Sequence, residues 1–218
     1  QNFYTHQPRA MHPYPRVTRA VQRIILLNIL VFAGQLLCDA PLLYVAAMMK
    51  AWLPGWAIRP EQFAGMPGGL LTSVFAFDPA RFIHGAIWMP VTYAFFHVGL
   101  MHLFQNMLFL YFFGPEVERV LGTRQFYRFF IFCGALGVLA TFVPMVLGFG
   151  NPLVLGASGA VLGVLVAFAM IDPEREIFLF PLPVPINARA LVAIVVAYNL
   201  ISALLIGSNL SVATHFGG

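Results

Sequence analysis

Four polar residues in this sequence carry the side chains that acyl transfer requires. Ser158 lies in the stretch Gly156-Ala157-Ser158-Gly159 at the start of an apolar segment, and His215 lies near the end of the chain. A serine hydroxyl activated by a histidine base is a nucleophile for peptide hydrolysis. His102 and Asn106 are spaced i, i+4, so on a helix they share one face and can direct two hydrogen-bond donors at one point. Together these residues predict a nucleophile, a base and donors for an oxyanion.

The glycines around Ser158 suit this chemistry. Gly156 and Gly159 allow another chain to approach the backbone closely, and a serine at a helix start leaves its amide N–H without an intrahelical partner. Such N–H groups stabilise an anion, so the Ser158 amide is a further candidate oxyanion donor. A second interpretation stays open, because small residues such as Gly159 and Gly163 are also typical of close packing between membrane helices. The G-x-S-x-G motif of soluble hydrolases does not apply, since position 160 is alanine.

A carboxylate that would complete a triad is hard to find near Ser158, so a Ser-His dyad is the simpler prediction. Asp172 would lie at the opposite end of the same apolar segment. Asp39 and Asp78 lie in a long connecting loop and stay open as alternatives.

His97 is expected to support the site from outside the helix. It precedes His102 by five residues, which is about 500° of helical rotation, so the two rings cannot share one helix face. A metal site made by His97, His102 and His215 is disfavoured by this phase and by the lack of a nearby carboxylate or cysteine. The sequence therefore predicts neither a metal nor a cofactor.

The composition indicates the environment of these residues. Of the 218 residues, 60% are hydrophobic and 9% are charged, against about 25% charged in soluble domains. A chain of this length cannot bury so many apolar residues in a water-soluble core, so we expect an all-α membrane protein. No basic patch with interleaved aromatic residues points to a nucleic acid. Cys38 and Cys133 indicate neither a disulfide framework nor a metal site.

Five apolar segments and the start of a sixth are expected to be membrane helices. Several are shorter than the ~20 residues that a hydrocarbon core requires, which neighbouring helices or a locally thin bilayer can accommodate. The second, fourth and sixth would run in the same direction, so the four polar residues would lie at a similar depth, where ionisable groups indicate a functional site. The segments are residues 24–37, 100–113, 126–147, 157–171 and 190–206, with the sixth starting near 212.

The distribution of basic residues predicts the orientation of the chain. Nine arginines lie in the N-terminal segment and in the second-to-third and fourth-to-fifth connections, against three basic residues on the other side. The positive-inside rule then places the N-terminus in the cytoplasm. We expect a cytoplasmic N-terminal segment, 1–23, and a membrane domain, 24–218, whose sixth helix is cut short. The Trp-rich, apolar loop 38–98 is expected to lie partly in the membrane interface.

Motifs along the chain from about Trp88 onward resemble those of the rhomboid family. Many members carry Trp-Arg in the first outer loop, whereas this chain has Trp88-Met89. The other motifs follow in the family's order. They are His97 to Asn106, similar to the family's His-x4-His-x3-Asn segment; Gly114, Glu118 and Gly122, similar to the end of the second helix; Gly156-Ala157-Ser158-Gly159, matching Gly-x-Ser-Gly; and residues 213–218, similar to the start of the final catalytic helix.

The resemblance implies a rhomboid-like bundle of six transmembrane helices that cleaves transmembrane substrates near the outer membrane face. It implies that Ser158 is the nucleophile and His215 the general base. Glu118 would hold the cytoplasmic end of the second helix. The remaining residues that the resemblance implies are His102 and Asn106 in the oxyanion site, and His97, Gly156 and Gly159 in supporting roles.

The expected partners are transmembrane protein substrates and the lipid bilayer, in a multi-pass protein of the bacterial inner membrane. The alternative is a non-catalytic rhomboid-like protein that binds membrane helices or serves as a subunit of a membrane complex. The short sixth helix favours this alternative, whereas the complete polar set favours the protease. A channel or transporter has less support, because the polar residues gather near one face instead of lining a path across the membrane.

Overall fold

The computed structural model describes residues 16–49, 69–146, 153–178 and 185–206, and within them the side chains except those of 39–49, 70, 144, 199–200 and 202–206. His215 and the expected sixth segment lie outside the described residues. The same holds for most of the predicted N-terminal segment.

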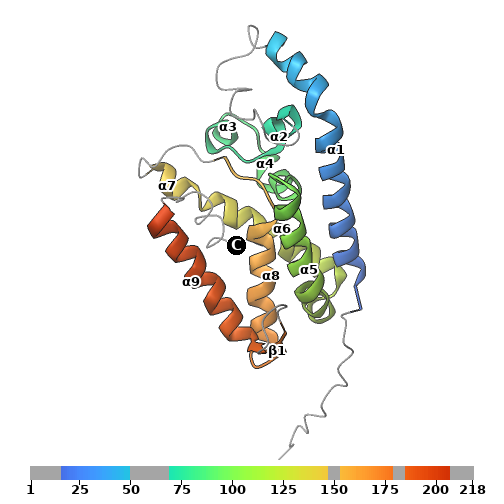
Figure 1. Cartoon of the computed structure of the whole chain (residues 1–218), viewed down its shortest axis with the longest axis vertical. Coiled ribbons are helices and arrows are strands. Elements are labelled where there is room, and N and C mark those ends of the chain that lie inside the picture. The colour runs from blue at the N-terminus through green and yellow to red at the C-terminus, as the bar shows by residue number, and fades with distance from the viewer. Residues whose placement is uncertain (1–15, 50–68, 147–152, 179–184, 207–218) are drawn as a thin grey trace, which may run out of the picture.

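The described chain is mostly helical, and α8 lies in the middle of the bundle (Figure 1). This helix is apolar on every side, a pattern typical of a helix surrounded by others. It packs against α5, α6 and α9, while α1 packs along α5. The long helices are α1 (Arg19–Met49), α5 (Leu100–Leu121), α6 (Thr123–Leu139), α8 (Ser158–Ile171) and α9 (Ala188–Ile206).

Helices α5 and α8 start at the same end of the bundle and run in the same direction. At their beginnings, His102 lies against Gly156. Further along, the rings of Phe113 and Phe168 are in contact, with centroids 5.0 Å apart. The expectation that the second and fourth apolar segments descend together is therefore confirmed for these two helices.

The expected third segment, 126–147, is not one helix. The chain forms α6, turns at residues 140–141, and then forms the short helix α7 (Phe142–Val146). The buried Thr141 hydroxyl donates to the Val138 carbonyl at 2.6 Å, so a side chain competes with the backbone for this acceptor. Pro144 adds a residue without a backbone N–H. The first, second, fourth and fifth segments begin within five residues of their expected starts, although α1 and α5 end later than predicted.

Among the described helices, α1 through residue 38 is long and apolar enough to cross a membrane by itself. Helix α5 meets the same test only together with Met89–Phe95, from which it is bent by 98°. The apolar parts of α8 and α9 are shorter. The six-helix arrangement stays a prediction.

The described parts of loop 38–98, residues 38–49 and 69–98, contain more helix than the sequence suggests. After α1 they contain α2 (Gly69–Phe75), α3 (Pro79–Ile83), α4 (Met89–Thr92) and the 3-10 helix η2 (Tyr93–Phe95). Between α2 and α3, Phe77 pairs with Val154 through two backbone hydrogen bonds of 2.8 and 2.9 Å. This pairing attaches the loop to the segment that leads into α8.

One small correction to the all-α expectation lies between α8 and α9. Strands β1 (Glu176–Ile177) and β2 (Ile186–Asn187) form an antiparallel hairpin of two residues each. Two exposed ion pairs lie beside this hairpin, between Arg175 and Asp172 and between Arg189 and Glu174.

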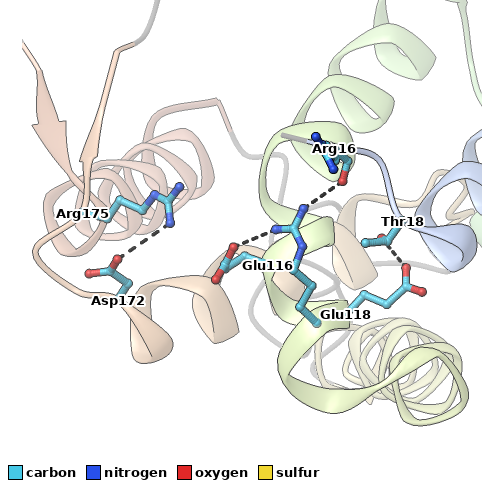
Figure 2. A network of polar contacts seen from close by, with 7 residues as sticks. Arg16, Thr18, Glu116, Glu118, Asp172 and Arg175 are labelled. Atoms are coloured by element: carbon cyan, nitrogen blue, oxygen red, sulfur yellow. Dashed lines mark hydrogen bonds and ion pairs between the residues drawn. The ribbon is translucent and has the colours of Figure 1, made fainter. Parts of the chain in front are cut away.

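At the end of α5, a buried carboxylate connects three helices. The side chain of Glu118 is 3% exposed and receives hydrogen bonds from the first turn of α1 and from the start of α6. The hydroxyl of Thr18, which directly precedes α1, also donates to this carboxylate (Figure 2). A carboxylate at a helix N-terminus satisfies free backbone N–H groups and the helix dipole together. We call this group the Glu118 cluster. Its donors are the Thr18 hydroxyl, the amides of Ala20 (3.0 and 3.1 Å) and Val21 (3.1 Å), and the Thr123 hydroxyl (2.7 Å).

Candidate active site

The turn that leads into Ser158 lies directly against His102. Gly156 has φ +117°, a left-handed conformation that favours glycine. A β-carbon at this position would lie 2.4 Å from His102 Cε1 and 2.9 Å from Nε2. Conformation and contact therefore both favour a glycine here, and its missing side chain leaves room for the imidazole beside the turn.

His97 contacts both parts of this arrangement. It lies before α5, as expected, and is fully buried. Its ring centroid is 5.2 Å from that of His102, with the rings edge to face at 67°. The amide of Ala157 donates to His97 Nε2 at 3.4 Å. This hydrogen bond requires Nε2 to be the acceptor, so it assigns the ring proton to Nδ1. We call His97, His102, Gly156 and Ala157 the His102 cluster.

Ser158 is the first residue of α8 and follows the His102 cluster directly. Its side chain is partly accessible, whereas Gly159 and Ala160 behind it are buried. The amides of the first helical turn have no acceptor within their own helix. The start of α8 therefore directs the backbone amides of its first turn toward the end of the bundle that holds the His102 cluster.

Asn106 lies one turn further along α5 and is 6% exposed. Its Nδ2 donates to the His102 carbonyl at 2.8 Å. An amide nitrogen carries two hydrogens, so one further donor remains for another acceptor. The hydrogen bond also restrains the Asn106 side chain to the same side of α5 as His102.

Sequence reasoning missed Tyr93 and Gln35. The Tyr93 carbonyl accepts from Gly156 N at 3.0 Å, and its hydroxyl donates to the Gly134 carbonyl at 2.6 Å. Tyr93 therefore connects the turn before Ser158 with α6. A fully buried tyrosine needs a partner for its hydroxyl, but no spacing in the sequence identifies a carbonyl as that partner. Gln35 was recognisable only as an amide within an apolar helix, a rare and costly placement.

The structure thus brings six of the predicted site residues to one end of the bundle. His215 lies outside the described residues. Asp78, considered as a third catalytic group, caps α3 by accepting from the amides of Ala80 and Arg81. Asp39 lies within α1, with its side chain outside the described set, and Asp172 follows the other end of α8. No group of three metal-binding side chains occurs in the described ranges. The six residues are His97, His102, Asn106, Gly156, Ser158 and Gly159.

The small-residue interpretation of α8 also has support. A β-carbon on Gly134 of α6 would lie 3.5 Å from the Ala160 β-carbon, which is ordinary contact distance. Small residues therefore let α6 and α8 approach closely. This packing lies directly behind Ser158 and does not exclude a reactive role for the serine.

The comparison with known families concerns the same part of the chain. The sequence model described as the Rhomboid domain matches residues 84–218. This chain belongs to the rhomboid family. The rhomboid match covers the whole His102 cluster, α5, α6, α8 and α9. Rhomboid proteins are integral to membranes, which agrees with the half-exposed leucines 26, 27 and 30 on α1.

Individual rhomboid relatives come from several organisms. Rhomboid protein 1, mitochondrial, of Saccharomyces cerevisiae is 35% identical over 128 residues, covering 57% of this chain and 37% of the relative. RHOMBOID-like protein 12, mitochondrial, of Arabidopsis thaliana is 27% identical over 179 residues, covering 75% of this chain and 50% of the relative. Rhomboid protease GluP of Bacillus subtilis is 31% identical over 135 residues, covering 62% of this chain and 24% of the relative. The chain thus spans half of these relatives' length or less.

Proposed function

We propose that this rhomboid is an intramembrane serine endopeptidase that cleaves transmembrane proteins near the outer membrane face. The observation that carries the proposal is the contact of His102 with Gly156 at the start of α8. It gathers a serine, candidate oxyanion donors and a glycine turn at one point. Membership in a family with a protease-named member, GluP, adds support.

In the proposed reaction, Ser158 Oγ attacks the scissile carbonyl carbon while His215 takes the hydroxyl proton. The carbonyl oxygen becomes an oxyanion, which the Ser158 amide, His102 and the second N–H of Asn106 stabilise. His215 then gives the proton to the leaving amine, and the C–N bond breaks to leave an acyl-enzyme. Water, deprotonated by His215, hydrolyses the ester and restores Ser158. No step needs a metal or a cofactor.

The surroundings of the site favour a strand-like substrate. Gly156 and Gly159 have no side chains, so an extended peptide can approach the backbone at Ser158 closely. A transmembrane helix would have to unwind locally before its carbonyl could reach the serine. On the basis of the arginine distribution we propose an N-terminus in the cytoplasm and a site near the outer face. We propose the bacterial inner membrane as the location, with the bacterial relative GluP as support.

A fluorophosphonate probe tests the nucleophile directly. We expect the purified full chain to be labelled, and Ser158→Ala and His215→Ala to lose labelling by on the order of 10⁴-fold or more, the scale for loss of a nucleophile or its base. Ser202→Ala in α9 and His84→Gln at the exposed end of α3 are controls that should label normally.

Two outcomes would reject the proposal. Labelling that persists in Ser158→Ala would assign the reactivity to another residue. An unlabelled but folded parent protein would favour the non-catalytic helix binder or complex subunit.

A further inference from the structure

A buried amide on α1 holds the backbone of His97 on both sides. Gln35 is fully buried. Its Oε1 accepts from the His97 amide at 3.1 Å, and its Nε2 donates to the His97 carbonyl at 3.2 Å. The same Nε2 donates to Thr72 Oγ1 at 3.0 Å, which adds α2 to the contact. One side chain therefore connects α1, α2 and the segment that precedes α5.

The pairing permits only one orientation of the Gln35 amide. If the amide were rotated, its N–H groups would face the His97 N–H and its oxygen would face the His97 carbonyl. In an apolar surrounding such mismatches leave polar groups unsatisfied at a cost of about 1–3 kcal/mol each. The backbone of His97 is consequently fixed to α1. This restrains the position from which its ring contacts the start of α8.

The contacts of His97 extend this restraint to Ser158. Its Nε2 accepts from Ala157 N at 3.4 Å, and its ring lies edge to face on His102. Ala157 is the residue before Ser158, and His102 lies on Gly156. The two residues directly before Ser158, Gly156 and Ala157, are thus held by contacts of His102 and His97 that begin at Gln35.

We propose that Gln35 is a positioning residue that sets the placement of Ser158 and the oxyanion donors through His97. Its effect on reactivity rests on the proposed protease function, whereas its effect on the α8 start does not. Gln35 touches no reacting atom. It acts by keeping the preceding turn in one geometry, and a displacement of about 1 Å in such a site costs up to ~10²-fold in rate.

Helix α1 supplies a matched control for this proposal. Asn28 is also fully buried, but its Nδ2 donates to Ile24 O of the same helix at 2.8 Å. Replacing Asn28 by leucine removes a buried amide without touching the His97 segment. Methionine has a side chain of similar length to glutamine. Replacing Gln35 by methionine therefore removes the buried amide together with its contacts to His97.

The experiment combines probe labelling with amide hydrogen exchange on the full chain. Per folded molecule, we expect Gln35→Met to be labelled at least ~10-fold more slowly than the parent, and Asn28→Leu to match the parent. Amide exchange in residues 153–160 should become faster in Gln35→Met only. Gln35→Glu should restore most of both signals, because burial favours a neutral carboxyl that accepts from His97 N–H and donates to its carbonyl.

Each result decides the proposal. Unchanged exchange at residues 153–160 in Gln35→Met would overturn it. Faster exchange with unchanged labelling per folded molecule would reject positioning and leave a purely structural contact. An unlabelled parent would reject the protease proposal, and exchange alone would then decide whether Gln35 places the start of α8.

Discussion

The two ends of the bundle use buried polar groups in opposite ways. In the Glu118 cluster, one carboxylate accepts from two hydroxyls and two backbone amides, so its acceptor capacity is filled. In the His102 cluster, Nδ1 of the buried His102 ring has no hydrogen-bond partner within the described residues. One end is saturated, and the other keeps hydrogen-bonding capacity in reserve.

If the proposed function holds, this difference separates the end that stabilises the fold from the end that carries the reaction. A saturated buried carboxylate holds helices together, because removing it leaves several donors unsatisfied. Buried polar groups without a hydrogen-bond partner lower the free energy of unfolding. Such a group therefore needs an explanation, for example a role in binding or catalysis. An unsatisfied atom alone is not diagnostic, since Asn28 Oδ1 also lacks a partner. What distinguishes the His102 cluster is that its open groups lie beside a helix start and a serine.

Among the changes that compare the two ends of the bundle, the largest effect should come from Gly156→Ala. The new β-carbon would collide with the His102 ring, and the alanine backbone would have to adopt a disfavoured positive φ. We expect a stability loss of about 3 kcal/mol from strain and overpacking and a labelling rate at least ~10²-fold lower. Thermal unfolding and fluorophosphonate labelling of the folded fraction measure the two effects.

Gly85 provides the control for conformation without contact. Its φ is +106°, and a β-carbon there would meet no atom within 4 Å. Gly85→Ala should therefore cost only the backbone strain, about 1–2 kcal/mol, and leave labelling unchanged. Equal loss of labelling in both variants would contradict the proposed role of the His102 contact.

A purely structural effect, without any change in labelling, is expected for Glu118→Gln. The amide keeps one acceptor but presents an N–H to donors, so the cluster loses about 2–4 kcal/mol. Labelling per folded molecule should equal that of the parent at temperatures where both are folded. Glu116→Gln, two residues earlier on α5, removes a partly exposed ion pair with Arg119 and should cost less than ~1 kcal/mol. A drop in labelling with Glu118→Gln would contradict the inference that the Glu118 cluster affects stability alone.

Local patterns explain how much of this fold was predictable. Apolar segments bounded by glycine and polar residues predicted the starts of α5 and α8 to within one residue. The break after α6 was missed because it depends on a buried hydroxyl competing for a carbonyl. The short helices of loop 38–98 were missed because they are stabilised by distant contacts, such as the pairing of Phe77 with Val154.

The site followed the same rule. Residue types and the i, i+4 spacing identified His102 and Asn106, and the glycine motif identified Ser158. Gln35 and its partner His97 are separated by 62 residues, so no local pattern connects them. Their relation exists only once α1 is packed beside the start of α5, and the pairing of Ser158 with His215 stays a prediction.

Apart from the control variants, the smallest effect should come from Tyr93→Phe, which tests whether every buried polar contact near Ser158 affects reactivity. The change removes the hydroxyl that donates to Gly134 O but keeps the Tyr93 carbonyl that accepts from Gly156 N. We expect a loss of about 1 kcal/mol in unfolding free energy and unchanged labelling per folded molecule. Tyr198→Phe, on the exposed face of α9, should change neither quantity. If Tyr93→Phe slowed labelling as Gln35→Met is expected to, then α6 as well as α1 would set the position of Ser158, and the reactive end would extend beyond the His102 cluster.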